Sequence, residues 1–186
     1  MSLDLIIGPM FSGKTTELIR RLNTLSAIGK KCVYINSSLD NREKKDFSSH
    51  NPDLKSITKI DSMKVQFINY QFIENIKKYD VIGIDECQLF GVNFITTTIR
   101  HIVDKLDKKV IISGLNGDFK RNKFGKIIDL IPECDSIIKL YPYCSSCSLN
   151  GKIEKALFSK KITGSDNIVD IGYDNYIPVC RKCYNN

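Results

Sequence analysis

The stretch that most constrains the fold of this chain is Gly8-Pro9-Met10-Phe11-Ser12-Gly13-Lys14-Thr15. It consists of a glycine, four residues and then Gly-Lys-Thr, and it joins the apolar run Leu5-Ile6-Ile7 to a segment with helical periodicity. Its glycines let successive backbone N–H groups face a polyphosphate at the positive end of the following helix. The stretch therefore predicts a phosphate-binding loop, with Lys14 at the β- and γ-phosphates and the Thr15 hydroxyl on Mg²⁺. A glycine-rich turn that binds nothing is the alternative.

The segments after this loop predict an α/β fold. Leu18, Leu22 and Leu25 fall on one face of a helix that ends near Gly29, and residues 31–35 form the next apolar run. A strand, helix and strand in this order favour a parallel sheet with helices on both faces. Further strands are expected at 80–84, 109–115 and 136–140, and helices at 65–78 and 94–106. The polar stretch from 37 to 62 is expected to be a loop.

A second chemical signal is the pair Asp85-Glu86, which follows the apolar run Val81-Ile82-Gly83-Ile84. A strand that ends in acids, downstream of a phosphate loop, is the usual form of the acidic strand that completes a magnesium site. Since adjacent residues at a strand end point in opposite directions, the two carboxylates have separate roles. We place Asp85 at the metal and expect Glu86 to take a proton from an attacking hydroxyl or to position a water. Two surface acids at a strand end are the alternative.

The loop after the strand at 109–115 carries aromatic residues among basic ones. Phe119 and Phe124 could wall a flat base, because aromatic faces stack on any nucleobase, although packing roles are the simpler interpretation. In the polar stretch after residue 37, Arg42 follows a strand end where ligands bind in such sheets, so it could reach a phosphate. A solvated loop arginine is the simpler interpretation there.

Four of the seven cysteines form two CxxC pairs, Cys144 with Cys147 and Cys180 with Cys183. Two such pairs predict tetrahedral Zn²⁺ held by four thiolates, because a reducing compartment disfavours disulfides and a redox pair would not explain the duplication. The closed site would be structural, and it would hold the ends of the loop between the pairs. We therefore expect two domains, a nucleotide-binding domain at 1–140 and a zinc-binding domain at 141–186.

The length and composition are those of one ordinary domain with a small appendage. The chain has 186 residues, 42% of them hydrophobic, and no apolar stretch long enough to span a membrane, so we expect a cytoplasmic protein without a membrane partner. The net charge of +7 comes from lysines that are scattered rather than gathered in a stripe. This favours a surface that attracts anionic substrates over one that binds nucleic acid specifically.

Together these motifs resemble the zinc-containing thymidine kinases of the cellular and poxvirus-like type. The resemblance runs in order from Leu5 to Tyr184. Four stretches carry it: the phosphate loop, Ile-Asp-Glu-Cys-Gln at 84–88, Gly-Leu-Asn-Gly-Asp-Phe at 114–119 with Phe124-Gly125 beyond, and Val-Cys-Arg-Lys-Cys-Tyr at 179–184.

The resemblance implies a P-loop NTPase-like fold and transfer of the γ-phosphate of Mg-ATP to the 5′-hydroxyl of thymidine, and of deoxyuridine as well, in nucleotide salvage. It makes Glu86 the general base and Arg42 a second catalytic residue. The residues it assigns to ATP and phosphate, besides the loop, are Asp40, Asp85 and Gln88. The residues it assigns to the nucleoside are Met10, Leu115, Phe119, Phe124, Tyr176 and a lasso formed by Asn167, Ile168, Val169, Asp170 and Ile171.

The family is typically tetrameric and is inhibited by thymidine triphosphate, and the resemblance implies both properties here. Leu89 departs from the aromatic residue that the family usually has beside the base. A nucleic-acid-dependent ATPase is the rival, since Asp-Glu-Cys-Gln resembles a helicase motif, but this length holds only one nucleotide-binding core. A GTPase and a purely structural zinc module fit less well, because the first needs an Asn-Lys-x-Asp stretch and the second leaves the phosphate loop unexplained.

Overall fold

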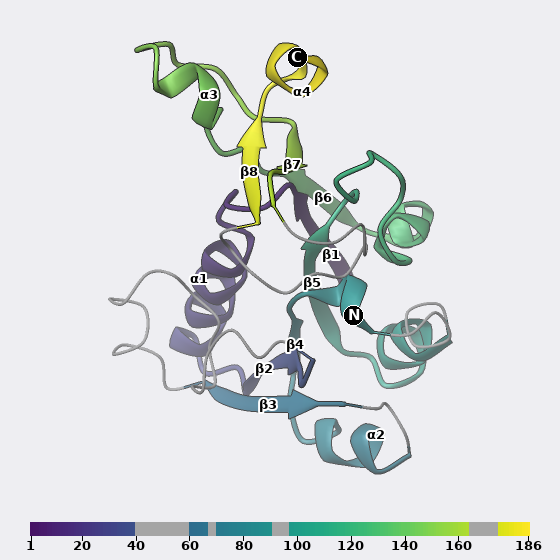
Figure 1. The fold of residues 1–186 in the computed structure, drawn as a ribbon. Coiled ribbons are helices and arrows are strands. Elements are labelled where there is room, and N and C mark those ends of the chain that lie inside the picture. The colour runs from purple at the N-terminus through teal and green to yellow at the C-terminus, as the bar shows by residue number, and fades with distance from the viewer. Residues whose placement is uncertain (40–59, 67–69, 91–96, 164–174) are drawn as a thin grey trace.

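The computed structural model of the protein describes residues 1–39, 60–66, 70–90, 97–163 and 175–186. Most of the described residues belong to a six-stranded parallel sheet with its helices (Figure 1). The strands of this sheet are β1 (Ser2–Gly8), β2 (Cys32–Ser37), β3 (Asp61–Val65), β4 (Val81–Ile84), β5 (Lys109–Leu115) and β6 (Ser136–Lys139). Their order across the sheet is β3-β2-β4-β5-β1-β6, and every neighbouring pair is parallel. The predicted fold class is therefore confirmed.

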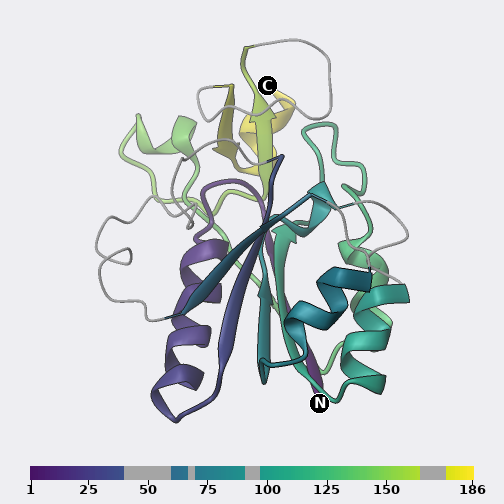
Figure 2. The ribbon, with the colours of Figure 1, turned by 90° about the horizontal axis from the view of Figure 1, so that it is seen from below.

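Helices cover both faces of the sheet, as Figure 2 shows. On one face, α1 (Lys14–Ala27) buries Leu18, Ile19 and Leu22 against the sheet. On the other face lie α2 (Tyr70–Ile76), the π-helix η4 (His101–Lys105) and the 3₁₀ helix η5 (Ile127–Glu133). The expected helix at 94–106 is described only from residue 97, because residues 91–96 lie outside the described part. Since both faces are covered, the central strands β1 and β5 are buried along almost their whole length, whereas a strand with one exposed face would be buried only at alternate residues.

The expectation for residues 61–65 was wrong. Asp61–Val65 is an edge strand, β3, and not the end of a loop followed by a helix from Val65. Ile60, just before the strand, packs with the α1 face, whereas Met63 and Val65 pack on the other face, so the segment has the two-residue period of a strand. Asp61 and Lys64 are exposed and hide this period, as charged residues often do on edge strands. Residues 67–69 of the expected helix lie outside the described part, and α2 covers Tyr70–Ile76.

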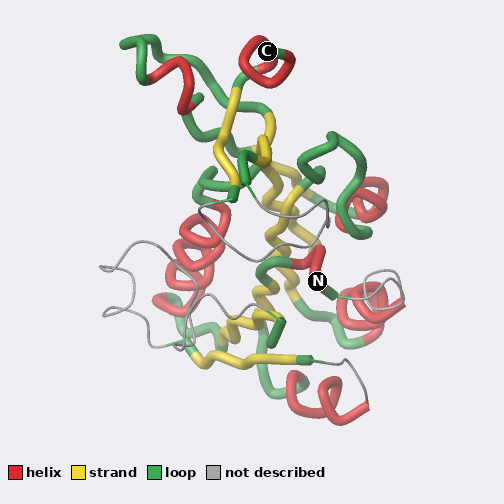
Figure 3. The backbone as a smooth tube through the Cα atoms, viewed as in Figure 1, coloured by secondary structure: helices red, strands yellow, loops and turns green. Residues whose placement is uncertain are grey.

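A second, two-stranded sheet lies beyond the carboxyl ends of the parallel strands (Figure 1). It pairs β7 (Phe158–Lys161) with β8 (Tyr176–Val179) in antiparallel register. The short helices α3 (Ser145–Ser148) and α4 (Arg181–Asn185) accompany it, as the tube in Figure 3 shows. Among the described residues, the buried hydrophobic cluster within this unit consists of Cys144, Ala156 and Val179.

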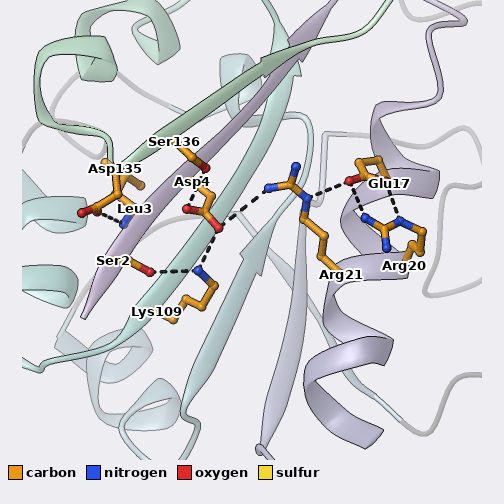
Figure 4. Close-up of polar contacts among 9 residues, drawn as sticks. All are labelled: Ser2, Leu3, Asp4, Glu17, Arg20, Arg21, Lys109, Asp135 and Ser136. Carbon is orange, nitrogen blue, oxygen red and sulfur yellow. Dashed lines mark hydrogen bonds and ion pairs between the residues drawn. The ribbon is translucent and has the colours of Figure 1, made fainter. Parts of the chain in front are cut away.

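An ionic network joins three neighbouring strands to α1 (Figure 4). Asp4 of β1, only 9% exposed, accepts hydrogen bonds from Lys109 Nζ of β5 (2.8 Å) and from Ser136 Oγ of β6 (2.9 Å). Arg21 of α1 lies 3.7 Å from the Asp4 carboxylate and donates to Glu17 (2.8 Å). The network fixes β5, β1 and β6 side by side.

Among the described residues, no helix is long and apolar enough to cross a membrane.

Candidate functional site

The predicted phosphate loop connects β1 to α1. Gly13 has left-handed backbone angles (φ 80°) at the position just before the helix, which a residue with a side chain rarely adopts. A Cβ at Gly8 would lie 2.7 Å from Ser12 Oγ and would also meet the Leu140 carbonyl oxygen, so glycine is required there by close approach. Lys14, which is 8% exposed, donates from Nζ to the Pro9 carbonyl oxygen (2.8 Å). Its ammonium group therefore lies over the loop, where a phosphate would be held.

Asp85 lies directly after β4, is 1% exposed and faces the first turn of α1. Its Oδ2 accepts hydrogen bonds from Thr15 Oγ1 (2.7 Å) and Tyr34 OH (2.8 Å). Its Oδ1 accepts hydrogen bonds from Ser113 Oγ and from the Glu86 backbone N–H (2.9 Å). Burial, and after it the neighbouring Glu86 carboxylate, raises the pKa of Asp85, while the three hydroxyl hydrogen bonds oppose that rise.

This arrangement fits a hard cation. The Thr15 hydroxyl and the Asp85 carboxylate offer two adjacent oxygen ligands beside the phosphate loop, which is the ligand type that Mg²⁺ prefers. Within the described part of the chain, the groups that donate hydrogen bonds to Asp85 are neutral, so a cation would find a carboxylate whose charge they do not neutralise. The fit supports the sequence-based pairing of Thr15 with Asp85.

Glu86 lies next to Asp85 but has a different environment. Its backbone is left-handed (φ 48°, ψ 44°), which is uncommon for a residue with a side chain and is often found at functional sites. Its side chain is half-buried, and its Oε2 accepts a hydrogen bond from Gln88 Nε2. The turn that follows, η2 (Cys87–Leu89), is a single 3₁₀ turn with Cys87 fully buried. The side chains of Asp85 and Glu86 thus have different hydrogen-bond partners.

The residues expected at the nucleoside come from three segments that meet above the sheet. Phe119, in the loop after β5, and Tyr176 of β8 have ring centroids 6.3 Å apart. Lys161 Nζ lies 5.1 Å from the Phe119 ring centroid and 5.5 Å from that of Tyr176. Met10, Leu115 and Phe124 are half-buried. The small sheet thus contacts the loop after β5 through Tyr176 and Lys161.

Several predicted site residues lie outside the described part of the chain. They are Asp40, Arg42, Asn167, Ile168, Val169, Asp170 and Ile171. Their assigned roles stay predictions.

Sequence reasoning missed three polar residues that hold the site together. Tyr34 and Ser113 donate to Asp85, and Ser159 Oγ accepts a hydrogen bond from the Met10 backbone N–H (3.0 Å). Ser159 is 6% exposed and joins β7 to the phosphate loop. A serine that interrupts the apolar run of β5 is a local signal for Ser113. Tyr34 looks like a core residue, and nothing near Ser159 in the sequence points to Met10.

The four predicted cysteines come together at the small sheet. Their Sγ atoms all lie within 4.8 Å of one another. Cys147 Sγ lies 3.8 Å from Cys180 Sγ and 3.6 Å from Cys183 Sγ, too far for a disulfide bond of about 2 Å. Sulfurs at the corners of a tetrahedron around Zn²⁺, with Zn–S of about 2.3 Å, are about 3.8 Å apart. The cluster therefore fits a closed four-thiolate metal site.

Comparison with known proteins gives one consistent family. The family model described as thymidine kinase matches residues 1–184. A thymidine kinase of Choristoneura fumiferana entomopoxvirus is 42% identical over 186 residues, covering 100% of this chain and 97% of that protein. Thymidine kinase 1 of Dictyostelium discoideum is 40% identical over 190 residues, covering 98% of this chain and 77% of that protein. Among solved structures, a genome-packaging NTPase of Sulfolobus turreted icosahedral virus 2 aligns with 76% of this chain and 74% of its own, at a TM-score of 0.48 and 19% identity.

Proposed function

Since the chain belongs to the thymidine kinase family, we propose that it transfers the γ-phosphate of ATP to the 5′-hydroxyl of thymidine. In this reaction the thymidine 5′-oxygen attacks the γ-phosphorus, the bond from that phosphorus to the β,γ-bridging oxygen breaks, and ADP leaves. The hydroxyl proton passes to a base on the protein. The observation that carries the proposal is the hydrogen bond between Thr15 and Asp85 beside the phosphate loop, with the Glu86 carboxylate next to it.

The phosphate side of the site is formed by the loop and its lysine. The loop from Gly8 to Thr15 would hold the triphosphate by its backbone N–H groups, and Lys14 would exchange its contact with the Pro9 carbonyl for the β- and γ-phosphates. Thr15 and Asp85 would hold Mg²⁺, which when bound neutralises charge on the β- and γ-phosphates. From the sequence resemblance we also assign contacts with the phosphates to Asp40 and Arg42.

Glu86 is the residue that we assign as general base. It lies next to the metal-side carboxylate yet takes no part in the hydrogen bonds of the Asp85 side chain except through its backbone N–H. A carboxylate in this place can accept the 5′-hydroxyl proton as the new phosphorus–oxygen bond forms, which contributes about 10²- to 10⁴-fold in rate.

The nucleoside would lie between the loop after β5 and the small sheet. We assign its pocket to Met10, Leu115, Phe119, Phe124 and Tyr176, with the backbone of residues 167–171 at the edge of the base. The ring pair Phe119 and Tyr176 supports this, because it joins the two walls across the place where a flat base would enter. A pocket that pairs the polar edge of the base discriminates strongly against analogues whose groups leave it unpaired.

The cysteine cluster would hold structural Zn²⁺ through Cys144, Cys147, Cys180 and Cys183. Bound there, zinc would supply folding energy to a unit whose own core is three buried residues. We accordingly divide the chain into a nucleotide-binding domain at 1–140 and a zinc-binding domain at 141–186. From the family we further propose a homotetramer in the cytoplasm, feedback inhibition by thymidine triphosphate and some activity on deoxyuridine.

The test is steady-state phosphate transfer from Mg-ATP to a panel of deoxynucleosides by the purified full chain. We expect a 5′-monophosphate product, formed preferentially from thymidine or deoxyuridine. The control is ATP hydrolysis with and without single-stranded DNA. Failure to phosphorylate any nucleoside, together with hydrolysis that rises on added DNA, would contradict the proposal and favour a nucleic-acid-dependent ATPase.

A further inference from the structure

Gln88 joins the end of strand β5 to the carboxylate of Glu86, which follows the neighbouring strand β4. It lies in the turn after Glu86 and is 7% exposed. Its Nε2 donates to Glu86 Oε2, and its Oε1 accepts a hydrogen bond from the backbone N–H of Leu115, at the end of β5 (3.0 Å). One buried amide therefore ties Glu86 to the backbone of the neighbouring strand.

The chemistry of its partners fixes the orientation of this amide. The Leu115 N–H is a donor, so it must face the amide oxygen, and the NH₂ group must then point toward Glu86. The reverse orientation would place an oxygen against a carboxylate oxygen and an NH₂ group against an N–H. The Gln88 amide is thus held in one orientation, with its NH₂ group donating to Glu86.

Two glycines leave the space that Gln88 occupies. A Cβ at Gly114 would lie 2.7 Å from Gln88 Oε1, and a Cβ at Gly125 would lie 2.9 Å from Gln88 Cα. The segment at Gly125 meets the backbone of residue 88, so it can approach this closely only as a glycine. A side chain at position 114 would instead push the amide oxygen away from its present place. The packing from two further segments leaves the amide little freedom to rotate.

We propose that Gln88 is the positioning residue for Glu86 in phosphoryl transfer, an inference that rests on the proposed function. Glu86 is half-buried, on a left-handed backbone, with a long side chain that has several rotamers. The amide fixes Oε2 and so turns the carboxylate toward the approaching hydroxyl. Gln88 itself touches neither substrate in this scheme, whereas the sequence had placed it among the phosphate-binding residues.

Two variants of Gln88 test the role. Gln88→Met keeps the volume and removes both hydrogen bonds, while Gln88→Glu keeps an oxygen for the Leu115 N–H and places a carboxylate against Glu86. We expect kcat to fall about 10- to 100-fold in both, the scale of a misplaced catalytic group, with KM for ATP and for thymidine within about twofold. Should Gln88→Met be unstable, Gln88→Glu carries the test. Gln71→Met, an exposed glutamine on α2 bonded to Asn75, is the matched control and should keep full activity.

A double-mutant cycle with Glu86→Gln separates positioning from general structural support. If Gln88 acts through Glu86, adding Gln88→Met to Glu86→Gln should lower kcat by less than about twofold further. Full additivity, a folded variant with wild-type kcat, or an effect on KM alone would overturn the inference. A wild-type protein with no nucleoside kinase activity would instead overturn the proposed function.

Discussion

Asp85 and Cys144 are both almost fully buried, but their surroundings differ. Asp85 lies at the edge of a sheet whose two faces are covered by helices, and four donors hold its carboxylate in place. Cys144 belongs to a small buried cluster with Ala156 and Val179, against which Cys147, Cys180 and Cys183 pack. The phosphate half of the site, which contains the phosphate loop and Asp85, therefore rests on a large hydrophobic core. The cysteine half, which contains the four cysteines and the small sheet, has a small core and a sulfur cluster that fits a metal.

The cysteine half and the phosphate half should therefore respond differently to mutation. A unit as small as the cysteine half cannot bury enough apolar surface to be stable without a staple. The phosphate half needs no such support, so its side chains can be altered without unfolding it. Hydrogen bonds from Met10 to Ser159 and from Tyr184 to Phe119 join the two halves.

The largest expected effect is the loss of the metal. Cys144→Ser should lower zinc from about one ion per chain to near zero and lower the melting temperature at the same time, because metal binding is folding energy in so small a unit. Thymidine binding should weaken far more than ATP binding. Metal analysis and thermal unfolding measure this.

The matched control is Cys134→Ser, which alters a half-buried cysteine after η5 that donates only to the Ile131 carbonyl. It should keep the zinc content of the wild type. Full zinc and an unchanged melting temperature in Cys144→Ser would remove the metal from the account of the cysteine half.

The next effect belongs to the phosphate half. Glu86→Gln should lower kcat about a hundredfold or more, the scale of general-base loss, with little change in ATP affinity or melting temperature. Steady-state kinetics and calorimetric ATP titration measure both. Glu154→Gln, an exposed glutamate of the cysteine half, is the control and should keep full turnover. Near-normal turnover in Glu86→Gln would take the role of base away from Glu86.

Removing one hydroxyl from Asp85 tests how firmly the core holds that carboxylate. Tyr34→Phe keeps the fully buried ring and removes the donor to Oδ2, so the free energy of unfolding should fall by about 1–3 kcal/mol. The Mg²⁺ concentration needed for half-maximal activity should rise. Urea denaturation and a magnesium titration measure these. In Tyr143→Phe, on a ring that is 64% exposed, neither quantity should change.

The sequence predicted the parts of the site that have a local pattern. The glycine spacing of the phosphate loop, the acids after an apolar strand and the two CxxC pairs each occupy a few consecutive residues. The structure places Thr15 of the loop against Asp85 and brings the four cysteines together. Strand β3 was missed because two of its five residues are exposed and charged, so its apolar residues form no continuous run.

The partners of these motifs could not be predicted, because they are contacts between distant segments. Asp85 and Tyr34 are 51 positions apart, and Met10 and Ser159 are 149 positions apart. Tyr34 has the same apolar neighbours as a core tyrosine, and only the register of β2 against β4 places its hydroxyl at Asp85. Gln88 was recognised within a motif, but its contact with Leu115 depends on the pairing of β4 with β5.

A smaller effect is expected at the junction of the two halves. Tyr184 donates from its hydroxyl to the Phe119 carbonyl oxygen (2.6 Å), while its ring packs on Phe158. Tyr184→Phe should therefore weaken thymidine binding by about 1 kcal/mol. KM for thymidine should rise by at most about fivefold, and KM for ATP should stay unchanged. Equal changes in both constants would show that the halves are coupled through more than this contact. Tyr143→Phe again serves as the control.

The smallest effect concerns an exposed ion pair in the first two turns of α1. The hydrogen bond from Arg20, opposed by burial and helped by Arg21, lowers the pKa of Glu17 from 4.5 to about 2. A carboxyl with a lower pKa in the folded state stabilises the fold above about pH 4.5 and loses that stabilisation as the pH falls toward 2. Arg20 is 61% exposed and water screens the pair. Glu17→Gln should therefore lower the free energy of unfolding by only about 0.5 kcal/mol at pH 7.

The difference in free energy of unfolding between wild type and Glu17→Gln should shrink as the pH falls below 4.5. Urea denaturation of both proteins at each pH measures it. Comparing the two proteins cancels the protonation of the cysteine thiolates, which destabilises both equally. A gap that stayed constant down to pH 3 would mean that Glu17 acts through packing on α1 and not through its charge. A gap several times larger would mean that the ionic network around Asp4 and Arg21 supports the sheet as strongly as its hydrophobic core does.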